Sequence, residues 1–213
     1  MAEYNKGFMG SFVGKLGPAV GSSWKRKSIL RSVANLKKSR KSTQAQTEHK
    51  AKFALAVDFA LLFERVIAET FQTLPENESP ANVLTREILE KAIAGTYPDF
   101  SIDYAQVPMA RGRLRSVTNP LISSPATGSL QLSWDDDSGG DYGFSNDRAI
   151  IVVYCPELKD MIYTVSNGTR ALSDVQLNVS FMAGREVHVW VAFKSVDGKR
   201  ISDSRYAGSV LVS

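Results

Sequence analysis

Through the C-terminal half of the chain, apolar residues recur at every second position. Segments 130–134 and 187–193 show this alternation clearly, and a period of two places successive side chains on opposite faces of a strand. Residues 149–154 are apolar throughout, so we predict that they form a central strand buried on both sides. Short strands separated by turn signals, such as the Asp197-Gly198 pair, favour an antiparallel β-sandwich over a parallel sheet with crossover helices.

A long helix is predicted before the strands, over residues 44–73. Thr43 and Gln46 have the spacing of a capping box, and apolar residues dominate from there until Pro75. Because several faces of this helix are apolar, we expect other parts of the protein to cover it on more than one side.

A second, shorter helix is predicted over residues 80–94. Ser79 followed by Pro80 is typical of a helix start, because serine caps the helix and proline fits its first turn. Gly95 is expected to terminate this helix, since glycine readily adopts the left-handed conformation that often ends a helix.

Glycines divide the N-terminal segment at intervals of three and four positions: Gly7, Gly10, Gly14, Gly17 and Gly21. A helix here would be poor in water, because each interior glycine costs about 1 kcal/mol relative to alanine and Pro18 removes a hydrogen-bond donor. The segment is therefore predicted either to lie extended or to pack as a helix whose glycine stripe allows close approach. In both cases it needs a partner surface, and we predict four anchors: Phe8, Phe12, Leu16 and Trp24.

Charge is divided unevenly along the chain. Residues 1–50 carry 8 Lys and 3 Arg against two acidic residues, a net charge of +9, whereas the remainder carries −5. Most of these bases form one patch: Lys25, Arg26, Lys27, Arg31, Lys37, Lys38, Arg40 and Lys41. Ile29, Val33 and Leu36 lie among them at helical spacing, so the stretch is predicted to be weakly amphipathic. The basic arm and the acidic body are expected to attract each other, within one chain or between chains.

These patterns predict an α+β fold in three parts: an extended glycine-rich basic arm over 1–42, a two-helix segment over 43–98 and the antiparallel β-sandwich over 99–213. The length of 213 residues and the 43% hydrophobic content allow one or two modest cores. No run approaches the roughly 20 apolar residues of a membrane-spanning helix, and no signal peptide is predicted. We therefore expect the protein to be cytoplasmic at synthesis.

The C-terminal strands follow a recognisable order along the chain. Residues 129–134, 149–154 and 187–204 resemble strands B, C and F–G of a fibronectin type III domain. Val187 departs from that family, which usually has a tyrosine at the start of strand F. The resemblance implies a fibronectin-like sandwich for the C-terminal part, and a related immunoglobulin-like topology stays open.

Short motifs spread along the chain carry a second resemblance. They lie at 14–17, 20–25, 31, 51–53, 97–100, 133–134 and 149–154, and include Val20-Gly21-Ser22-Ser23-Trp24-Lys25. In these motifs the chain resembles, over almost its full length, a family of uncharacterised bacterial proteins, a domain of unknown function found mainly in Bacteroidota. This resemblance implies no activity.

Gly14-Lys15 is similar to part of a phosphate-binding loop, but the rest of that motif is missing. Met9 stands where the first glycine would be, and Leu16 replaces the hydroxyl that binds magnesium. No predicted strand precedes the pair either. We therefore expect no nucleotide, and no other cofactor, at this loop.

Four aspartates lie around a glycine pair: Asp135, Asp136, Asp137 and Asp141. Carboxylates on a turn suit Ca²⁺, but an EF-hand loop would need an acid or amide at Gly139 and a glutamate at Asn146. We therefore interpret the segment as a solvated loop between strands, with weak Ca²⁺ binding as the lesser alternative.

Cys155 is the single cysteine, which excludes an internal disulfide, and the two histidines leave little for metal chemistry. Cys155 and His188 together would suit nucleophilic catalysis. However, Cys155 precedes a proline at a strand end and His188 alternates with buried valines. We predict an inert thiol and a partly exposed sheet histidine, and therefore no enzyme and no small-molecule substrate.

The preferred hypothesis is a structural protein that forms homo-oligomers through its N-terminal arm, as components of virions, tubes or filaments do. Nucleic-acid binding is the first alternative, because cations beside Trp24 suit phosphates and bases. A membrane surface is the least favoured partner of the basic stretch. A carbohydrate- or protein-binding module is a further alternative, with Tyr142 and Phe144 as the contacts.

Overall fold

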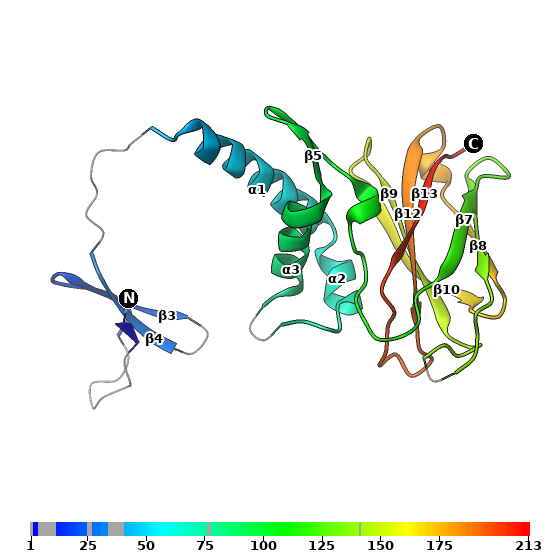
Figure 1. Ribbon diagram of the computed structural model, residues 1–213, viewed down its shortest axis with the longest axis horizontal. Helices are drawn as coiled ribbons and strands as arrows, with labels where there is room; N and C mark the ends of the chain where they lie inside the picture. The colour runs from blue at the N-terminus through cyan, green and yellow to red at the C-terminus, as the bar shows by residue number, and fades with distance from the viewer. Residues whose placement is uncertain (1, 4–11, 25–26, 34–40, 76–77, 141) are drawn as a thin grey trace. The chain divides into compact units, whose positions relative to one another are not determined.

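The computed structural model describes residues 2–3, 12–24, 27–33, 41–75, 78–140 and 142–213 (Figure 1). It divides the chain into two compact units, Met1–Thr43 and Gln44–Ser213, and each is described by itself. Helices and antiparallel sheets together confirm the predicted α+β fold.

Seven strands form a sandwich in the larger unit: β7 Thr118–Ser123, β8 Ser129–Asp135, β9 Arg148–Cys155, β10 Asp160–Thr169, β11 Asp174–Asn178, β12 Glu186–Lys194 and β13 Arg205–Leu211. One sheet has the order β10-β9-β12-β13 and the other the order β11-β8-β7. Neighbouring strands all pair antiparallel, which confirms the predicted C-terminal sandwich. The predicted central strand is β9, which has a hydrogen-bonded neighbour on each side.

Strand β9 is buried on both faces, as its continuous apolar sequence predicts. Ile151 and Val153 belong to a core shared with Leu130 and Leu132 of the three-stranded sheet. On the opposite face of β9, Tyr154 belongs to a second core, which contains the helices. The four-stranded sheet is therefore the middle of three layers, with the helices on one face and the three-stranded sheet on the other (Figure 1).

The helical layer consists of α1 Gln44–Leu62, α2 Glu64–Thr70, α3 Pro80–Glu87 and a π-helical turn, η1 Ile88–Ala92. The prediction of one helix over 44–73 is wrong, because the helix breaks at Phe63 and ends at Thr70. The Phe63 N–H donates at 3.2 Å to the Ala60 carbonyl, three residues back instead of four. The Phe63 ring lies 5.3 Å from the Tyr154 ring, in the core under the sheet. None of the described helices is long and apolar enough to cross a membrane.

Ser79 caps α3 as predicted, since its hydroxyl accepts a hydrogen bond from the Asn82 N–H at 3.3 Å. Gly95, however, does not terminate the second helix, which ends at Ala92. It lies in β5 Ile93–Thr96, which forms a hairpin with β6 Asp99–Ile102. Gly95 has a φ of +84°, and a Cβ there would lie 2.4 Å from the Asp99 carbonyl oxygen. Glycine at this position therefore allows β5 and β6 to pair, because any side chain would clash with the backbone of Asp99.

The smaller unit contains a sheet of four short strands: β1 Ala2–Glu3, β2 Gly14–Leu16, β3 Ala19–Trp24 and β4 Lys27–Ser32, in the order β1-β4-β3-β2. The arm is thus extended, and the helical alternative is wrong for its described residues. The helical spacing of Ile29 and Val33 is also misleading, because Ile29 lies in β4; Leu36 lies outside the described residues. Gly17, with a φ of +56°, and Pro18 form the two-residue turn from β2 to β3.

A buried arginine holds the loop that follows β8. The side chain of Arg170 is fully buried and pairs with the carboxylates of Asp137 and Asp147, of which the second is 1% exposed. Its guanidinium also donates to the Arg115 carbonyl oxygen at 2.9 Å and lies 3.9 Å from the centre of the Phe193 ring. The prediction of a solvated loop is therefore wrong for Asp137, whose carboxylate is the partner of a buried cation.

Candidate functional site

The register of the small N-terminal sheet gathers basic residues and a tryptophan on one face. Lys15 pairs with Val20, which pairs with Arg31, and Trp24 pairs with Lys27. Residues that pair across strands share a face, as do residues two positions apart on one strand. Lys15, Lys27, Arg31 and Trp24 are all exposed. We call this the basic face of the sheet.

The opposite face carries small and apolar residues, and Phe12 lies on it. Leu16 pairs with Ala19, and Gly21 pairs with Leu30, on this face. A Cβ on Gly21 would lie 2.6 Å from the Phe12 ring and 2.5 Å from the Phe12 carbonyl oxygen. Only glycine at position 21 therefore allows Phe12 to lie this close. The close contact predicted for the glycine-rich segment is thus made within its own sheet.

The described residues of this unit bury no large apolar side chain. Among the residues whose burial is described, only Gly21 and Ser28 are buried. Val13 is 76% exposed, Leu16 is 67% exposed and Trp24 is 59% exposed. A sheet normally buries one face against another layer, and the described residues of this unit supply no such layer for its apolar surface.

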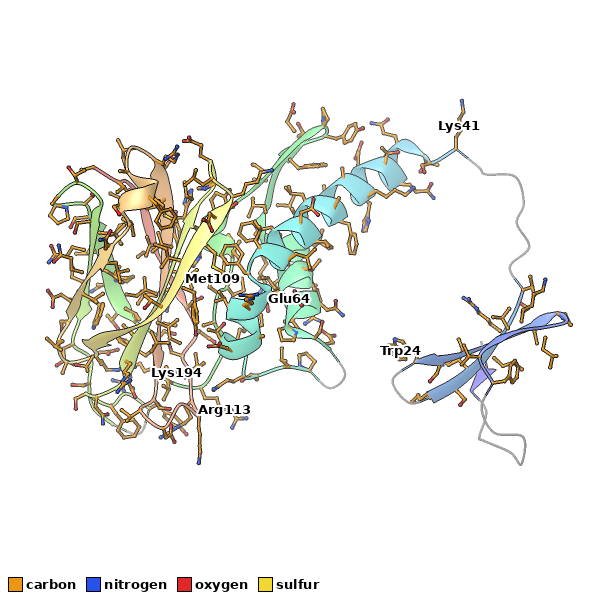
Figure 2. The ribbon with its side chains drawn as sticks, turned by 180° about the vertical axis from the view of Figure 1, so that it is seen from behind. Trp24, Lys41, Glu64, Met109, Arg113 and Lys194 are labelled. Carbon is orange, nitrogen blue, oxygen red and sulfur yellow. The ribbon has the colours of Figure 1, made fainter. Side chains whose placement is uncertain are left out.

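The predicted site residues are only partly brought together. Leu16 and Trp24 are exposed on opposite faces of the sheet, and Phe12 packs on Gly21. Lys41 lies just before α1 and not on the sheet; Figure 2 labels it together with Trp24. The remaining predicted anchor and bases lie outside the described residues: Phe8, Lys25, Arg26, Lys37, Lys38 and Arg40.

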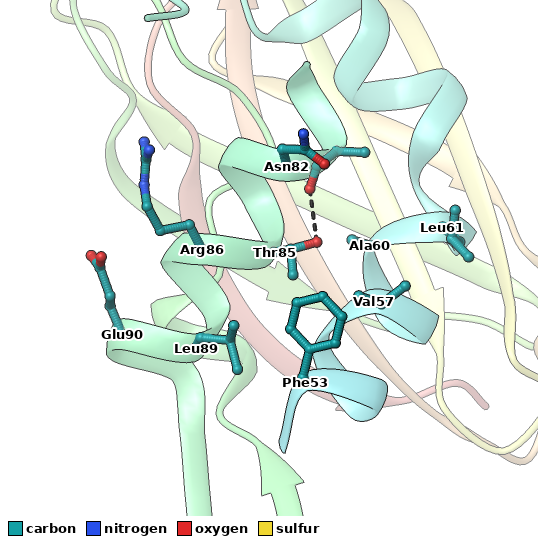
Figure 3. Close-up of a pocket in the computed structure, with 10 residues that line it drawn as sticks. Phe53, Val57, Ala60, Leu61, Asn82, Thr85, Arg86, Leu89 and Glu90 are labelled. Atoms are coloured by element: carbon teal, nitrogen blue, oxygen red, sulfur yellow. Dashed lines mark hydrogen bonds between the residues drawn. The ribbon is translucent and has the colours of Figure 1, made fainter. Parts of the chain in front are cut away.

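A groove of about 460 Å³ lies between α1 and α3, in the helical layer (Figure 3). It is lined by Phe53, Val57, Ala60, Leu61, Ala81, Asn82, Thr85, Arg86, Leu89 and Glu90. The predicted long apolar helix was expected to be covered on several sides, yet Phe53 is 49% exposed and Leu61 is 55% exposed. The groove is one part of the apolar surface of α1 that stays open.

The aspartates at the end of β8 and just after it are engaged in local contacts. Asp135 accepts from the Asn119 side chain at 2.6 Å, and Asp136 accepts from the Ser138 N–H at 2.9 Å. The hydrogen bonds from Ser138 lower the pKa of Asp136. Asp141 lies outside the described residues, and within the described ones no group of three side chains is arranged to hold a metal ion.

Cys155 and His188 lie on opposite sides of the four-stranded sheet. Cys155 is fully buried in the core between the two sheets. His188 pairs with Tyr154, on the helix side, and its Nδ1 lies 2.7 Å from the Tyr206 hydroxyl. Desolvation lowers the pKa of the His188 imidazole below its ordinary value. The structure therefore does not bring the thiol and the imidazole together as a nucleophilic pair.

The two aromatics suggested for carbohydrate contact lie in the loop between β8 and β9. Tyr142 is 55% exposed and Phe144 is 39% exposed. The guanidinium of Arg200 lies 5.3 Å from the centre of the Phe144 ring, so a cation already covers part of that ring. This leaves Tyr142 as the more accessible of the two contacts.

Residues 11–208 match the sequence model of a protein family, DUF6266, which is described as a family of unknown function. No curated protein matches the chain. Among solved structures, the fn3 domain of human collagen alpha-1(XX) chain is similar, with 17% identity, a TM-score of 0.37, and coverage of 47% of this chain and 86% of that chain. The family match agrees with the second resemblance drawn from the sequence, and the sandwich itself is described from its own strands and cores.

Proposed function

We propose that this chain, which belongs to the family of unknown function DUF6266, is a non-catalytic structural protein that self-associates through its N-terminal sheet. One observation carries the proposal: among the residues of this unit whose burial is described, only Gly21 and Ser28 are buried, while Val13, Leu16 and Trp24 are more than half exposed. A sheet of short strands without a covering layer is marginal by itself. A second copy would supply the burial that the sheet lacks.

The exposed side chains are large enough to drive such an association. Fully burying an exposed side chain of this kind contributes about 1.5–3 kcal/mol, and Val13, Leu16 and Trp24 would each contribute the share that matches their exposed fraction. Ordering the contact and losing translational freedom oppose this gain. Because Leu16 and Trp24 lie on opposite faces of the sheet, one contact covers only part of this apolar surface, and the gain suits a weak interface.

The edge of the sheet and its charge favour the same partner. Within the described residues, β2 pairs only with β3, and all three of its residues are exposed. An open edge accepts another strand through main-chain hydrogen bonds. Residues 1–50 carry a net charge of +9, which is attracted to the net charge of −5 on residues 51–213 of a second copy.

Replacing Leu16 with glutamate is expected to dissociate the oligomer. The substitution places a charge on an exposed apolar position of the sheet without disturbing a core, because Leu16 is 67% exposed. Light scattering on a sizing column should give a multiple of the chain mass for the wild type and the mass of one chain for the variant. Deleting residues 1–43 should have the same effect.

Leu172→Glu is the matched control, because Leu172 is 61% exposed and lies in the larger unit. This control should keep the wild-type mass. A wild-type protein that runs as a single chain, or a Leu16→Glu variant that keeps the parent's mass, would contradict self-association through the sheet.

The basic face supports a second candidate, the binding of single-stranded nucleic acid. Lys15 and Arg31 flank Val20 in one cross-strand row, and Trp24 lies on the same face. Proteins that bind single strands without sequence preference typically combine cations, which contact the phosphate backbone, with an aromatic ring on which bases stack. This arrangement of the basic residues follows from the register of the sheet.

A gel shift with a single-stranded oligonucleotide at two salt concentrations tests this candidate. Binding should weaken as salt rises, and Lys15→Gln with Arg31→Gln should reduce the slope of log K against log salt by about 0.7 for each lost phosphate contact. An affinity that does not change with salt concentration, or a double variant that binds like the wild type, would exclude the basic face as the binding surface.

A further inference from the structure

A second basic surface lies in the larger unit, at a distance in sequence from the N-terminal arm. It is a cleft of about 480 Å³, lined by Gln72, Thr73, Leu74, Arg113, Lys199 and Arg200. Three separate chain segments meet there: the connection after α2, the connection before β7 and the turn after β12. Figure 2 labels Arg113 and Lys194, which lie at the same end of this unit.

Backbone hydrogen bonds hold these segments in place. The Gln72 N–H donates to the Arg111 carbonyl oxygen at 3.0 Å, and the Leu114 N–H donates to the Ile201 carbonyl oxygen at 3.0 Å. Between them, Gly112 lies so close to Ile201 that a Cβ would be 1.8 Å from that carbonyl oxygen. The Gly112 N–H donates to the Asp203 carboxylate at 3.0 Å. The position of Arg113 beside the turn at 199–200 is therefore fixed by the fold.

The cleft is cationic in a part of the chain that is otherwise acidic. No carboxylate lines it, whereas three of its six lining residues are Arg or Lys. The structure records no ion pair for Arg113, Lys199 or Arg200 within the described residues. Residues 51–213 carry a net charge of −5, so this cluster of three cations has the opposite sign to the part of the chain that contains it.

Two carboxylates lie near the cleft, and both have other donors. Asp197 accepts from the Ser195 hydroxyl and from the Lys199 N–H at 3.0 Å. Asp203 accepts from the Gly112 N–H, as described above. Neither lines the cleft. The pKa of Asp197 is lowered first by hydrogen bonds from Ser195 and Lys199, and the charges of Arg200 and Lys199 help to lower it further. The Arg200 guanidinium also lies 5.3 Å from the centre of the Phe144 ring. These contacts engage the two cations only in part, since neither forms an ion pair among the described residues and both line the cleft with Arg113.

We propose that this cleft binds a phosphate-bearing anion. The planar guanidinium groups of Arg113 and Arg200 suit two oxygens of one phosphate, and Lys199 adds a point charge. Gln72 and Thr73 provide neutral donors at the same cleft. A volume of this size accommodates two or three linked phosphates, supplied either by a small oligophosphate or by a nucleic-acid backbone. The inference is independent of self-association through the N-terminal sheet.

Isothermal titration of the full chain with sodium triphosphate tests the proposal. Binding is expected at about 20 mM NaCl and should weaken at about 150 mM NaCl, because added salt screens exposed charges. Arg113→Gln combined with Lys199→Gln should weaken binding by about tenfold or more, since each removes one charge-assisted contact. Both residues are exposed, so the variant should keep the thermal midpoint of the wild type.

The control is Lys91→Gln combined with Lys159→Gln, which removes two exposed cations that do not line the cleft. It should bind like the wild type. A second titration with a single-stranded oligonucleotide distinguishes the source: a loss with the cleft variant would show that the cleft takes a nucleic-acid backbone. No binding of either probe, or equal loss in the cleft and control variants, would overturn the proposal.

Discussion

Replacing Arg170 with alanine is expected to lower the free energy of unfolding by about 3–5 kcal/mol, the cost of breaking a buried ion pair from one side. The side chain of Arg170 is fully buried, and so is that of Asp147, so removing the cation leaves a buried carboxylate without its partner. The variant also loses the contact with the Phe193 ring at 3.9 Å. Urea denaturation followed by tryptophan fluorescence measures the change.

Arg185→Ala is the control for this prediction. Arg185 also pairs with a carboxylate, Glu157 at 2.9 Å, but the two side chains are 32% and 68% exposed. An exposed pair of this kind contributes about 0–1 kcal/mol, so the control should stay close to the wild type. If Arg170→Ala destabilises no more than Arg185→Ala, the ion pairs of Arg170 do not hold the loop after β8.

The architecture of the larger unit was accessible from the sequence because its signals are local. The alternation at 130–134 and the continuous apolar run at 149–154 each follow directly from which faces of a strand are buried. Ser79 was recognisable as a cap because the capping hydrogen bond spans only three residues. These local signals were enough for the strands and the cap, whereas Gly95 shows that a local signal also fails where a hairpin pairing decides the structure.

The remaining features depend on partners that are distant in sequence. Composition marks residues 12–24 as a poor helix, but only the pairing of β3 with β4 makes them a sheet with a basic face. The break at Phe63 reflects packing against Tyr154, 91 positions further on. Arg170 looks like an ordinary surface arginine until Asp137 and Asp147 are folded around it. Arg113 and Lys199 likewise belong to one cleft only in the folded chain.

Substituting Gly112 with alanine is expected to destabilise the larger unit by about 3 kcal/mol, at the upper end of the cost of overpacking. The added Cβ would lie 1.8 Å from the Ile201 carbonyl oxygen, and that oxygen is backbone, so it has no rotamer by which to move away. Relief requires separating residues 111–114 from Ile201, which breaks the Leu114–Ile201 hydrogen bond of 3.0 Å. Thermal unfolding followed by circular dichroism measures the loss.

Gly143→Ala separates this clash from the general effect of replacing a glycine. A Cβ at Gly143 would meet its nearest neighbour, the Asp137 carbonyl oxygen, at 3.5 Å, which is an ordinary contact. The substitution there should be neutral or stabilising by up to about 1 kcal/mol, because alanine restricts the unfolded chain. A Gly112→Ala variant as stable as Gly143→Ala would mean that residues 111–114 do not lie against Ile201, and the phosphate cleft beside them would then lose its framework.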